Sequence, residues 1–157
     1  MPLTQAQFQG LTTTTIAGFS IAQLQAFTVE IGYFLPTQFA VLADTQLAAL
    51  SNTQLGSFDP AAIAAMNTFQ LSGLNAAQVG SFTVDEMNAL GTEVIVSLTT
   101  AQVTGLTERQ IIGLDAAHIG AFASGQTDGF LATQAQALVI KAVQSAGGRS
   151  RLVEPSR

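Results

Sequence analysis

The chain repeats a unit of eight residues, seen most clearly as TTAQVTGL at 99–106 and TERQIIGL at 107–114. These octads occupy residues 4–27 and 35–130, and a seven-residue spacer at 28–34 lies between the two runs. Position eight is apolar in all fifteen octads, and position five is apolar in fourteen. So regular a pattern predicts that every octad adopts the same local structure and turns the same two side chains inward.

Each octad carries the signals that begin a helix. Position one is Ser, Thr, Asp or Asn in eleven octads, and position four is Gln or Glu in eleven. This spacing is typical of a capping box, in which the two residues hydrogen-bond each other's backbone N–H groups. Pro36 and Pro60 fall on position two, the first helical residue, where proline is tolerated. The pattern therefore predicts a new helix of one and a half to two turns in every octad.

A single long helix is excluded by the phase of the repeat. Eight residues advance a helix by about 800°, so an apolar stripe would slip by about 80° in each octad. Short helices are marginal alone and need packing, and the small residue at position seven would let neighbouring backbones approach closely. We therefore expect an all-α solenoid, a superhelix of short capped helices. The alternative is a β-solenoid, because Thr, Val, Ile and Phe also suit strands.

The solenoid is expected to cover residues 4–146. The spacer at 28–34 shifts the register by one residue, either as a tolerated deletion or as a boundary or contact site. Residues 131–146 should form a longer helix that caps the array, ending at Gly147 and Gly148. In it Leu138, Val139, Val143 and Ile140 are expected to be buried. Residues 147–157 are predicted to be a disordered tail.

Composition narrows the possible partners. The net charge is −5, and four of the five basic residues follow position 140. Such a surface repels phosphate backbones, which argues against nucleic-acid binding. No apolar run approaches the roughly 18 residues that span a bilayer, so we expect no membrane insertion. Partners should be proteins or further copies of the chain, and a small-molecule ligand is left open.

The chain offers little for chemistry. The one histidine, His118, occupies position four, where it can partly replace the capping glutamine. Asp85 and Glu86 are neighbours in a first helical turn, where the helix dipole favours acids and adjacent side chains point apart. There is no cysteine and no calcium or phosphate loop. We expect no enzyme activity, cofactor or metal.

One weaker pattern concerns apolar residues outside positions five and eight. If their positions face water, they could form a contact patch, although they could instead be partly buried between neighbouring turns. This predicted contact patch consists of Phe69, Val84, Val94, Val96 and Ile112.

The string L-[ST]-x-x-Q-[ILV]-x-x-L, present as LSNTQLGSF, LTTAQVTGL and LTERQIIGL, resembles tandem repeats of large, repetitive bacterial proteins. The resemblance covers roughly residues 3–130 and implies a secreted or cell-surface protein of adhesin-like type, with a cytoplasmic location left open. We expect a non-catalytic spacer, stalk or adhesive segment of a larger protein, possessing a capacity for self-assembly. The alternative function is a solenoid scaffold that binds a protein partner.

Overall fold

The computed structural model describes the backbone of residues 2–150 and the side chains of residues 2–144. Within that range the chain forms helices and no strand, so the all-α prediction is confirmed and the β-solenoid alternative is wrong. Fifteen short helices of four to six residues precede one long helix, and a 3₁₀ helix occupies the spacer. The helices are α1 (Gln5–Gln9), α2 (Thr13–Ala17), α3 (Ile21–Ala26), η1 (Val29–Tyr33), α4 (Pro36–Phe39), α5 (Asp44–Ala48), α6 (Asn52–Leu55), α7 (Pro60–Ile63), α8 (Thr68–Ser72), α9 (Ala76–Val79), α10 (Val84–Ala89), α11 (Thr92–Val96), α12 (Thr100–Val103), α13 (Glu108–Gly113), α14 (Ala116–Ala121), α15 (Ser124–Thr127) and α16 (Ala132–Ser150).

Helices begin as the capping pattern predicts. At α12, the Thr99 hydroxyl accepts a hydrogen bond from the backbone N–H of Gln102 at 3.2 Å, and Gln102 Oε1 accepts one from the Thr99 N–H at 3.0 Å. Where position one lacks a polar side chain, as at Ala43, the glutamine half remains, because Gln46 Oε1 accepts from the Ala43 N–H at 2.7 Å. The glutamine half of the cap can therefore form without a polar side chain at position one.

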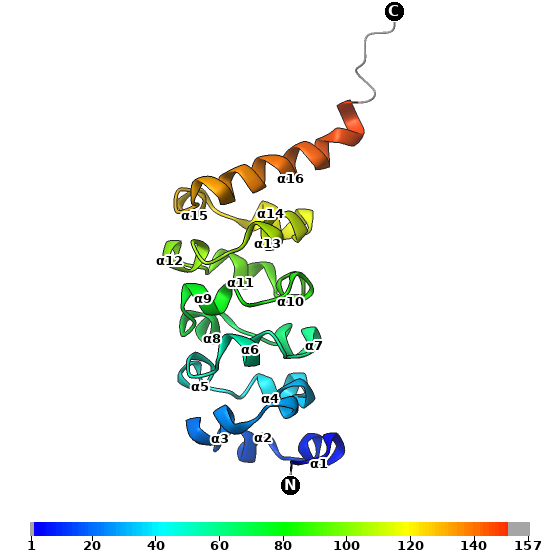
Figure 1. Ribbon diagram of the computed structural model, residues 1–157, viewed down its shortest axis with the longest axis vertical. Helices are drawn as coiled ribbons and strands as arrows, with labels where there is room; N and C mark the ends of the chain where they lie inside the picture. Colours follow the sequence, from blue (N-terminus) through cyan, green and yellow to red (C-terminus); the bar gives the residue numbers. More distant parts are fainter. Residues whose placement is uncertain (1, 151–157) are drawn as a thin grey trace, which may run out of the picture.

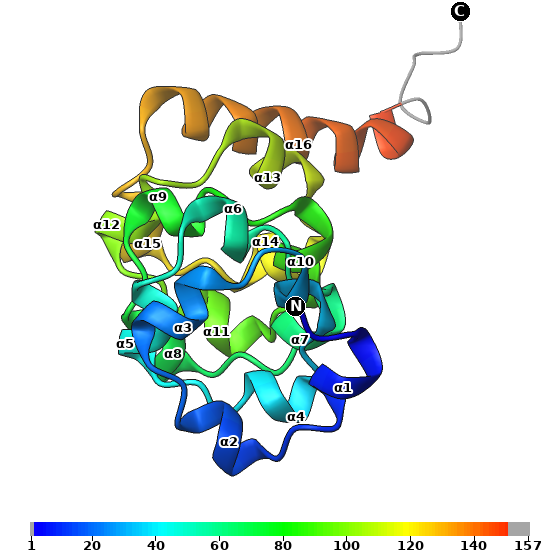
Figure 2. The ribbon, with the colours of Figure 1, turned by 60° about the horizontal axis from the view of Figure 1, so that its bottom comes forward.

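The short helices stack in chain order along the longest dimension of the molecule (Figure 1). A helix packs mainly on the third helix along the chain, as α4 does on α7, α7 on α10 and α10 on α13. Figure 2 shows the helices arranged around a common interior, which the residues of positions five and eight fill. Position five is fully buried from Phe8 to Ile111 with an exposed fraction of at most 1%. Packing, rather than helix length, therefore stabilises these short elements.

Position seven lies where successive layers touch. A Cβ atom added to Gly73 would lie 2.8 Å from the carbonyl oxygen of Asp44, and one added to Gly105 would collide with the backbone of Ala76. Both contacts join position seven to position two of the octad three units earlier. The prediction that small residues at position seven allow close backbone approach is confirmed.

Side-chain amides connect layers that lie farther apart in the sequence. Besides capping its own helix, each interior position-four glutamine donates from Nε2 to backbone carbonyls near the end of an earlier helix. Gln102, for example, donates to Leu74, 28 residues earlier, at 2.8 Å and to Leu71, 31 residues earlier, at 2.7 Å. The last carbonyls of a helix lack partners within that helix, so the amide of a later octad satisfies them. We call this set of glutamines the amide ladder: Gln38, Gln46, Gln54, Gln70, Gln78, Gln102, Gln110, Gln126 and Gln134.

The amide ladder crosses the spacer without a break. Gln38, Gln46 and Gln54 reach the carbonyls of Leu11, Phe19 and Phe27, each 27 residues earlier instead of 28. The missing residue is therefore taken up by the 3₁₀ helix η1, which stands in the place of one octad. This favours the interpretation of 28–34 as a tolerated deletion.

The C-terminal helix differs from its prediction in two respects. Helix α16 does not end at Gly147 and Gly148 but runs to Ser150, so residues 147–150 are helical rather than part of a disordered tail. The remaining tail, 151–157, lies outside the described residues. The buried face is also different, since Gln134 and Ala137 are buried while Val139, Ile140 and Val143 are 61%, 43% and 63% exposed. The amide of Gln134, bonded to Val103 and Leu106, sets the rotation of the helix and turns residues 139, 140 and 143 away from the stack.

Candidate functional site

One hollow of the described surface lies where the spacer begins. It encloses about 590 Å³ between the end of α3, the start of η1 and helices α5 and α6. None of its nine lining residues carries a charge: Gln25, Phe27, Thr28, Ala49, Leu50, Ser51, Thr53, Gln54 and Ser57. The hollow can therefore offer hydrogen bonds and one aromatic ring, but no charged acid, base or anion-binding group.

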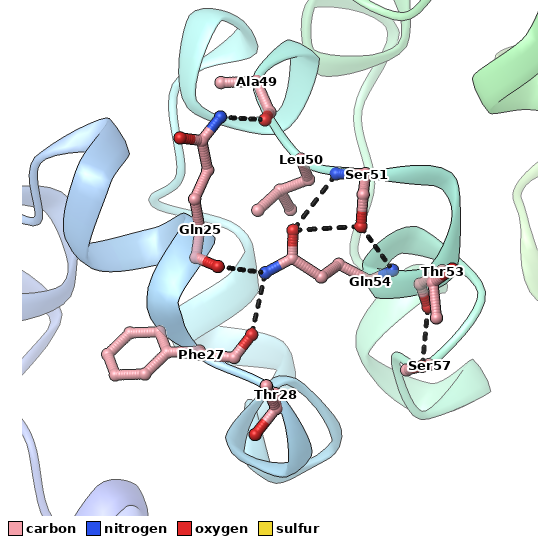
Figure 3. Close-up of a pocket in the computed structure, with 9 residues that line it drawn as sticks. All are labelled: Gln25, Phe27, Thr28, Ala49, Leu50, Ser51, Thr53, Gln54 and Ser57. Atoms are coloured by element: carbon pink, nitrogen blue, oxygen red, sulfur yellow. Dashed lines mark hydrogen bonds between the residues drawn. The ribbon is translucent and has the colours of Figure 1, made fainter.

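Most polar groups around this hollow already have partners in the fold (Figure 3). Gln25 Nε2 donates to the Ala49 carbonyl at 2.8 Å, and Gln54 Nε2 donates to the Phe27 carbonyl at 2.8 Å. The Ser57 hydroxyl donates to the Thr53 carbonyl at 2.7 Å. The two glutamine bonds join different layers of the stack, and the serine bond lies within one octad. The polar groups in the walls of the hollow therefore have a structural role.

Two titratable residues occupy position four, where the amide ladder has glutamine. His118 is 6% exposed, and its Nε2 lies 2.8 Å from the carbonyl oxygen of Leu90, 28 residues earlier. Its Nδ1 lies 2.7 Å from Asp115 Oδ1. Burial by itself lowers the pKa of His118, but the hydrogen bonds to Leu90 and Asp115 outweigh burial and raise it. The imidazole thus replaces the ladder glutamine as a donor to the earlier layer. The Asp115 N–H, which would donate to the glutamine in a capping box, donates instead to Asn88 Oδ1 at 2.9 Å.

Glu86 is the other titratable residue at position four, and it is 1% exposed. Its Oε2 accepts a hydrogen bond from the Thr83 N–H at 2.6 Å, as a glutamine would, but Oε1 is buried without a hydrogen-bond partner. Burial raises the pKa of Glu86, although its bonds with Thr83 oppose that rise. Glu86 can take the donor role of glutamine only when Oε1 carries a proton.

The Glu86→Gln variant should be more stable than the parent at neutral pH by about 1–3 kcal/mol, because it supplies the missing donor and removes a buried charge. In the parent, a raised folded-state pKa gives stability that is complete below the unfolded pKa of Glu86 and is lost as pH rises through the folded pKa. Urea unfolding midpoints between pH 4 and pH 9 would show this loss, and the variant should lack it.

His118 contributes a second step of the same sign to that curve. Its stabilising effect is complete below the unfolded pKa and is lost as pH rises through the higher folded pKa. The Glu86→Gln variant should keep this step, and Glu86→Gln combined with His118→Gln should abolish it. A parent curve that rises across this range would contradict the proton-donor role of both side chains.

The five residues of the predicted contact patch differ widely in their exposure. Val94 is 1% exposed and belongs to the core, because position four points under the preceding layers; its inclusion in an exposed patch was wrong. Val84 and Ile112 are half-buried, whereas Phe69 and Val96 are 66% and 52% exposed. The last two lie on α8 and α11, which pack against each other.

Other site features are few in the described part of the chain. No group of three His, Asp or Glu side chains there lies close enough to hold a metal ion. No helix among these residues combines the length and apolarity needed to cross a bilayer. The chain matches no family model, no curated protein and no solved structure.

The amide ladder was the feature that sequence reasoning missed. The prediction gave the position-four residue one function, capping, for which Gln and Glu are equally suited because each has an oxygen acceptor. Yet ten octads have Gln there and only one, that of Glu86, has Glu. This preference for a side chain that also donates was the available signal.

Proposed function

We propose that the octads form a solenoid that serves as a non-catalytic structural module, a spacer, stalk or adhesive segment of a larger repetitive protein. The observation that supports it best is the amide ladder, in which one bond pattern recurs from Gln38 to Gln134. A bond pattern that depends only on sequence offset can be extended by further octads without redesign of any part.

Duplication of residues 67–98, four octads, tests the module directly. If the chain is a solenoid, the 32 added residues keep each ladder amide at its present offset, which for Gln102 is 28 and 31 residues. X-ray scattering should then show a longer particle of unchanged cross-section, and the urea midpoint should be equal or higher. A shorter, wider or unfolded product would contradict the proposal.

The extracellular location also remains a proposal, supported by the resemblance of the octads to repeats of bacterial surface proteins. Protease treatment of intact source cells tests it, with a cytosolic protein as the control. Digestion from outside would support the spacer or adhesin function. Protection until lysis would favour a scaffold inside the cell.

The alternative function, a scaffold for a protein partner, is supported by the exposed apolar side chains of Phe69 and Val96. A scaffold should have one face on which substitutions abolish binding, whereas a spacer should tolerate them everywhere. Phe69→Ser with Val96→Ser is the test on this face. Unchanged partner capture and oligomeric state would count against the scaffold.

A further inference from the structure

Two neighbouring octads near the middle of the stack lack the amide-ladder bond to an earlier layer. Their position-four residues are Glu86 and Val94, and neither side chain donates a hydrogen bond to another layer. The octads on either side have Gln78 and Gln102 there, and both glutamines donate to carbonyls of an earlier layer. Elsewhere along the amide ladder, no two successive octads lack such a donor. We call residues 83–98 the ladder gap.

The carbonyls opposite the ladder gap have no protein donors. The ladder offset of 28 residues pairs Glu86 with Phe58 and Val94 with Met66, and both partners are 4% exposed. Within the part of the chain that the structure describes, neither of these two carbonyls accepts a hydrogen bond. Glu86 Oε1 is buried without a partner as well. Because a buried acceptor without a donor destabilises the fold, the contact between these layers is weaker than the contacts beside it.

Helix α11, in the second octad of the ladder gap, is also weak by its own sequence. Its N-cap is Gly91, which has no side chain to accept a hydrogen bond, and Val94 cannot supply the glutamine half of the cap. Every other α-helix among the described residues has at least one capping hydrogen bond. Four of the five residues of α11 are β-branched and therefore disfavour a helix: Thr92, Val94, Ile95 and Val96. So short a helix depends on packing, which the ladder gap weakens.

No charged group compensates the Glu86 carboxylate. Helix α10 packs on α7 and α13. The other charged side chains of these three helices and their N-caps are all exposed: Asp59, Asp85, Glu108 and Arg109. His118 contacts the far end of α10, at the Leu90 carbonyl, and the one ion pair of the described residues joins it to Asp115. Glu86 can therefore supply a donor only through a proton on its own carboxyl group.

We propose that the ladder gap is an opening point of the stack, at which the layers part and α10 and α11 unfold locally while the other helices stay folded. The ladder gap lies in the middle of the stack (Figure 1), away from the ends, where fraying is expected. Opening uncovers Met87 and Ile95, which are fully buried in the closed stack. Protonation of Glu86 opposes the opening, because it adds a donor to the gap. This inference rests on the packing of the described helices and goes beyond the spacer function.

Hydrogen–deuterium exchange of the full chain tests the opening point. At neutral pH, the amides of α10 and α11 should be protected roughly ten- to hundredfold less than those of α8, α9, α12 and α13. Glu86→Gln combined with Val94→Gln supplies both missing donors, and the second change also offers an acceptor to the Gly91 N–H. In this double variant, α10 and α11 should be protected as well as the neighbouring helices.

Glu86→Gln combined with Val96→Gln is the matched control. Val96 lies on the same helix as Val94 but is 52% exposed, so an amide at that position reaches no buried carbonyl. In the control, α10 should gain protection, whereas α11 should exchange as fast as in the parent.

A lower pH should close part of the ladder gap without the second substitution. At pH 9 the protection of α10 should be about tenfold lower in the parent than in the Glu86→Gln variant. At pH 4 the two should be nearly equal, because the protonated carboxyl group of Glu86 can donate as the amide does. Both proteins keep His118, so the difference between them isolates Glu86.

Three results would overturn the opening point. In the first, α10 and α11 of the parent are protected as well as their neighbours. In the second, the double variant protects α11 no better than the control does. In the third, the double variant has a lower urea midpoint than the parent, which would mean that the ladder gap does not accept a donor. An equal difference between the parent and Glu86→Gln at both pH values would contradict the control of opening by Glu86. The duplication test of the spacer is separate from all of these measurements.

Discussion

Gln102→Leu is expected to lower the free energy of unfolding by about 3–5 kcal/mol. It leaves the Leu74 carbonyl and the Thr99 N–H without partners and takes one of two hydrogen bonds from the Leu71 carbonyl, which still accepts from the Leu74 N–H. The Gln102 amide donates to Leu71 and Leu74 and accepts from the Thr99 N–H, and the side chain is 4% exposed. Leucine has a similar volume and keeps the packing, so the loss reports the hydrogen bonds. Urea unfolding followed by circular dichroism measures it.

Gln7→Leu is the matched control. Gln7 makes the same local bonds as Gln102, to the N–H of Thr4 at 3.0 Å and to the Thr4 hydroxyl at 3.1 Å. It has no carbonyl partner in an earlier layer, so its replacement should change stability by only about 1 kcal/mol, the usual effect of a lost cap. The difference between the two variants isolates the bonds between layers. Equal losses would mean that the ladder contributes nothing beyond capping.

Gln102→Glu extends the same argument to charge. One carboxylate oxygen can still accept from Thr99, but the other meets the carbonyls of Leu71 and Leu74, to which an ionised oxygen cannot donate. The variant should therefore be weakest at neutral pH and recover when the carboxyl is protonated. A loss that does not depend on pH would argue that size, and not the donor, determines the residue at position four.

The local structure could be predicted from the sequence because its determinants are local. The cap of α12 depends on Thr99 and Gln102, three residues apart, and the burial of Val103 and Leu106 follows from their recurrence in every octad. The residues of one octad, however, do not indicate which earlier octad will pack beneath it. The offset of 28 residues depends on how many helices complete a layer, which is a property of tertiary packing.

Helix α16 shows where the octad pattern stops being informative. The sequence predicts that Val139 and Val143 are buried, whereas both are exposed. After Ala132 the chain does not restart a helix, so a single helical period decides the buried face. Gln134 and Ala137 take that face, and Leu138 and Lys141 follow on its edge. These four residues have the i, i+3, i+4 and i+7 spacing of an ordinary buried helical face. The first of them, however, is the polar Gln134, which is held by the carbonyls of Val103 and Leu106.

The predicted contact patch failed at Val94 for a related reason. The patch requires that position four face water, yet the polar residue usual at that position is buried by its bonds to another layer. A valine in the same position is therefore core. Phe69 and Val96 stand at positions three and six, which face water, so the exposed part of the patch agrees with the pattern.

Among the glycines that the structure describes, Gly105 is the one whose change to Ala should lower the stability of the fold most. The new Cβ would collide with the backbone of Ala76 in α9, and a backbone cannot swing aside as a flexible side chain can. Relief requires the layers to separate, which disturbs the stacked helices α9 and α12 together. Overpacking of this kind lowers the free energy of unfolding by about 1–3 kcal/mol and occasionally more, and we expect the upper end of that range.

Gly120→Ala is the same chemical change with the opposite expected sign. Gly120 lies within α14, and a Cβ added there meets no atom within 4 Å. Alanine is favoured over glycine in a helix by about 0.5–1 kcal/mol, so this variant should be more stable than the parent. Urea midpoints of the two variants would thus move in opposite directions from the parent. If both moved upward, the layers could not lie as close at position seven as Gly105 and Ala76 do, and small residues there would need another explanation.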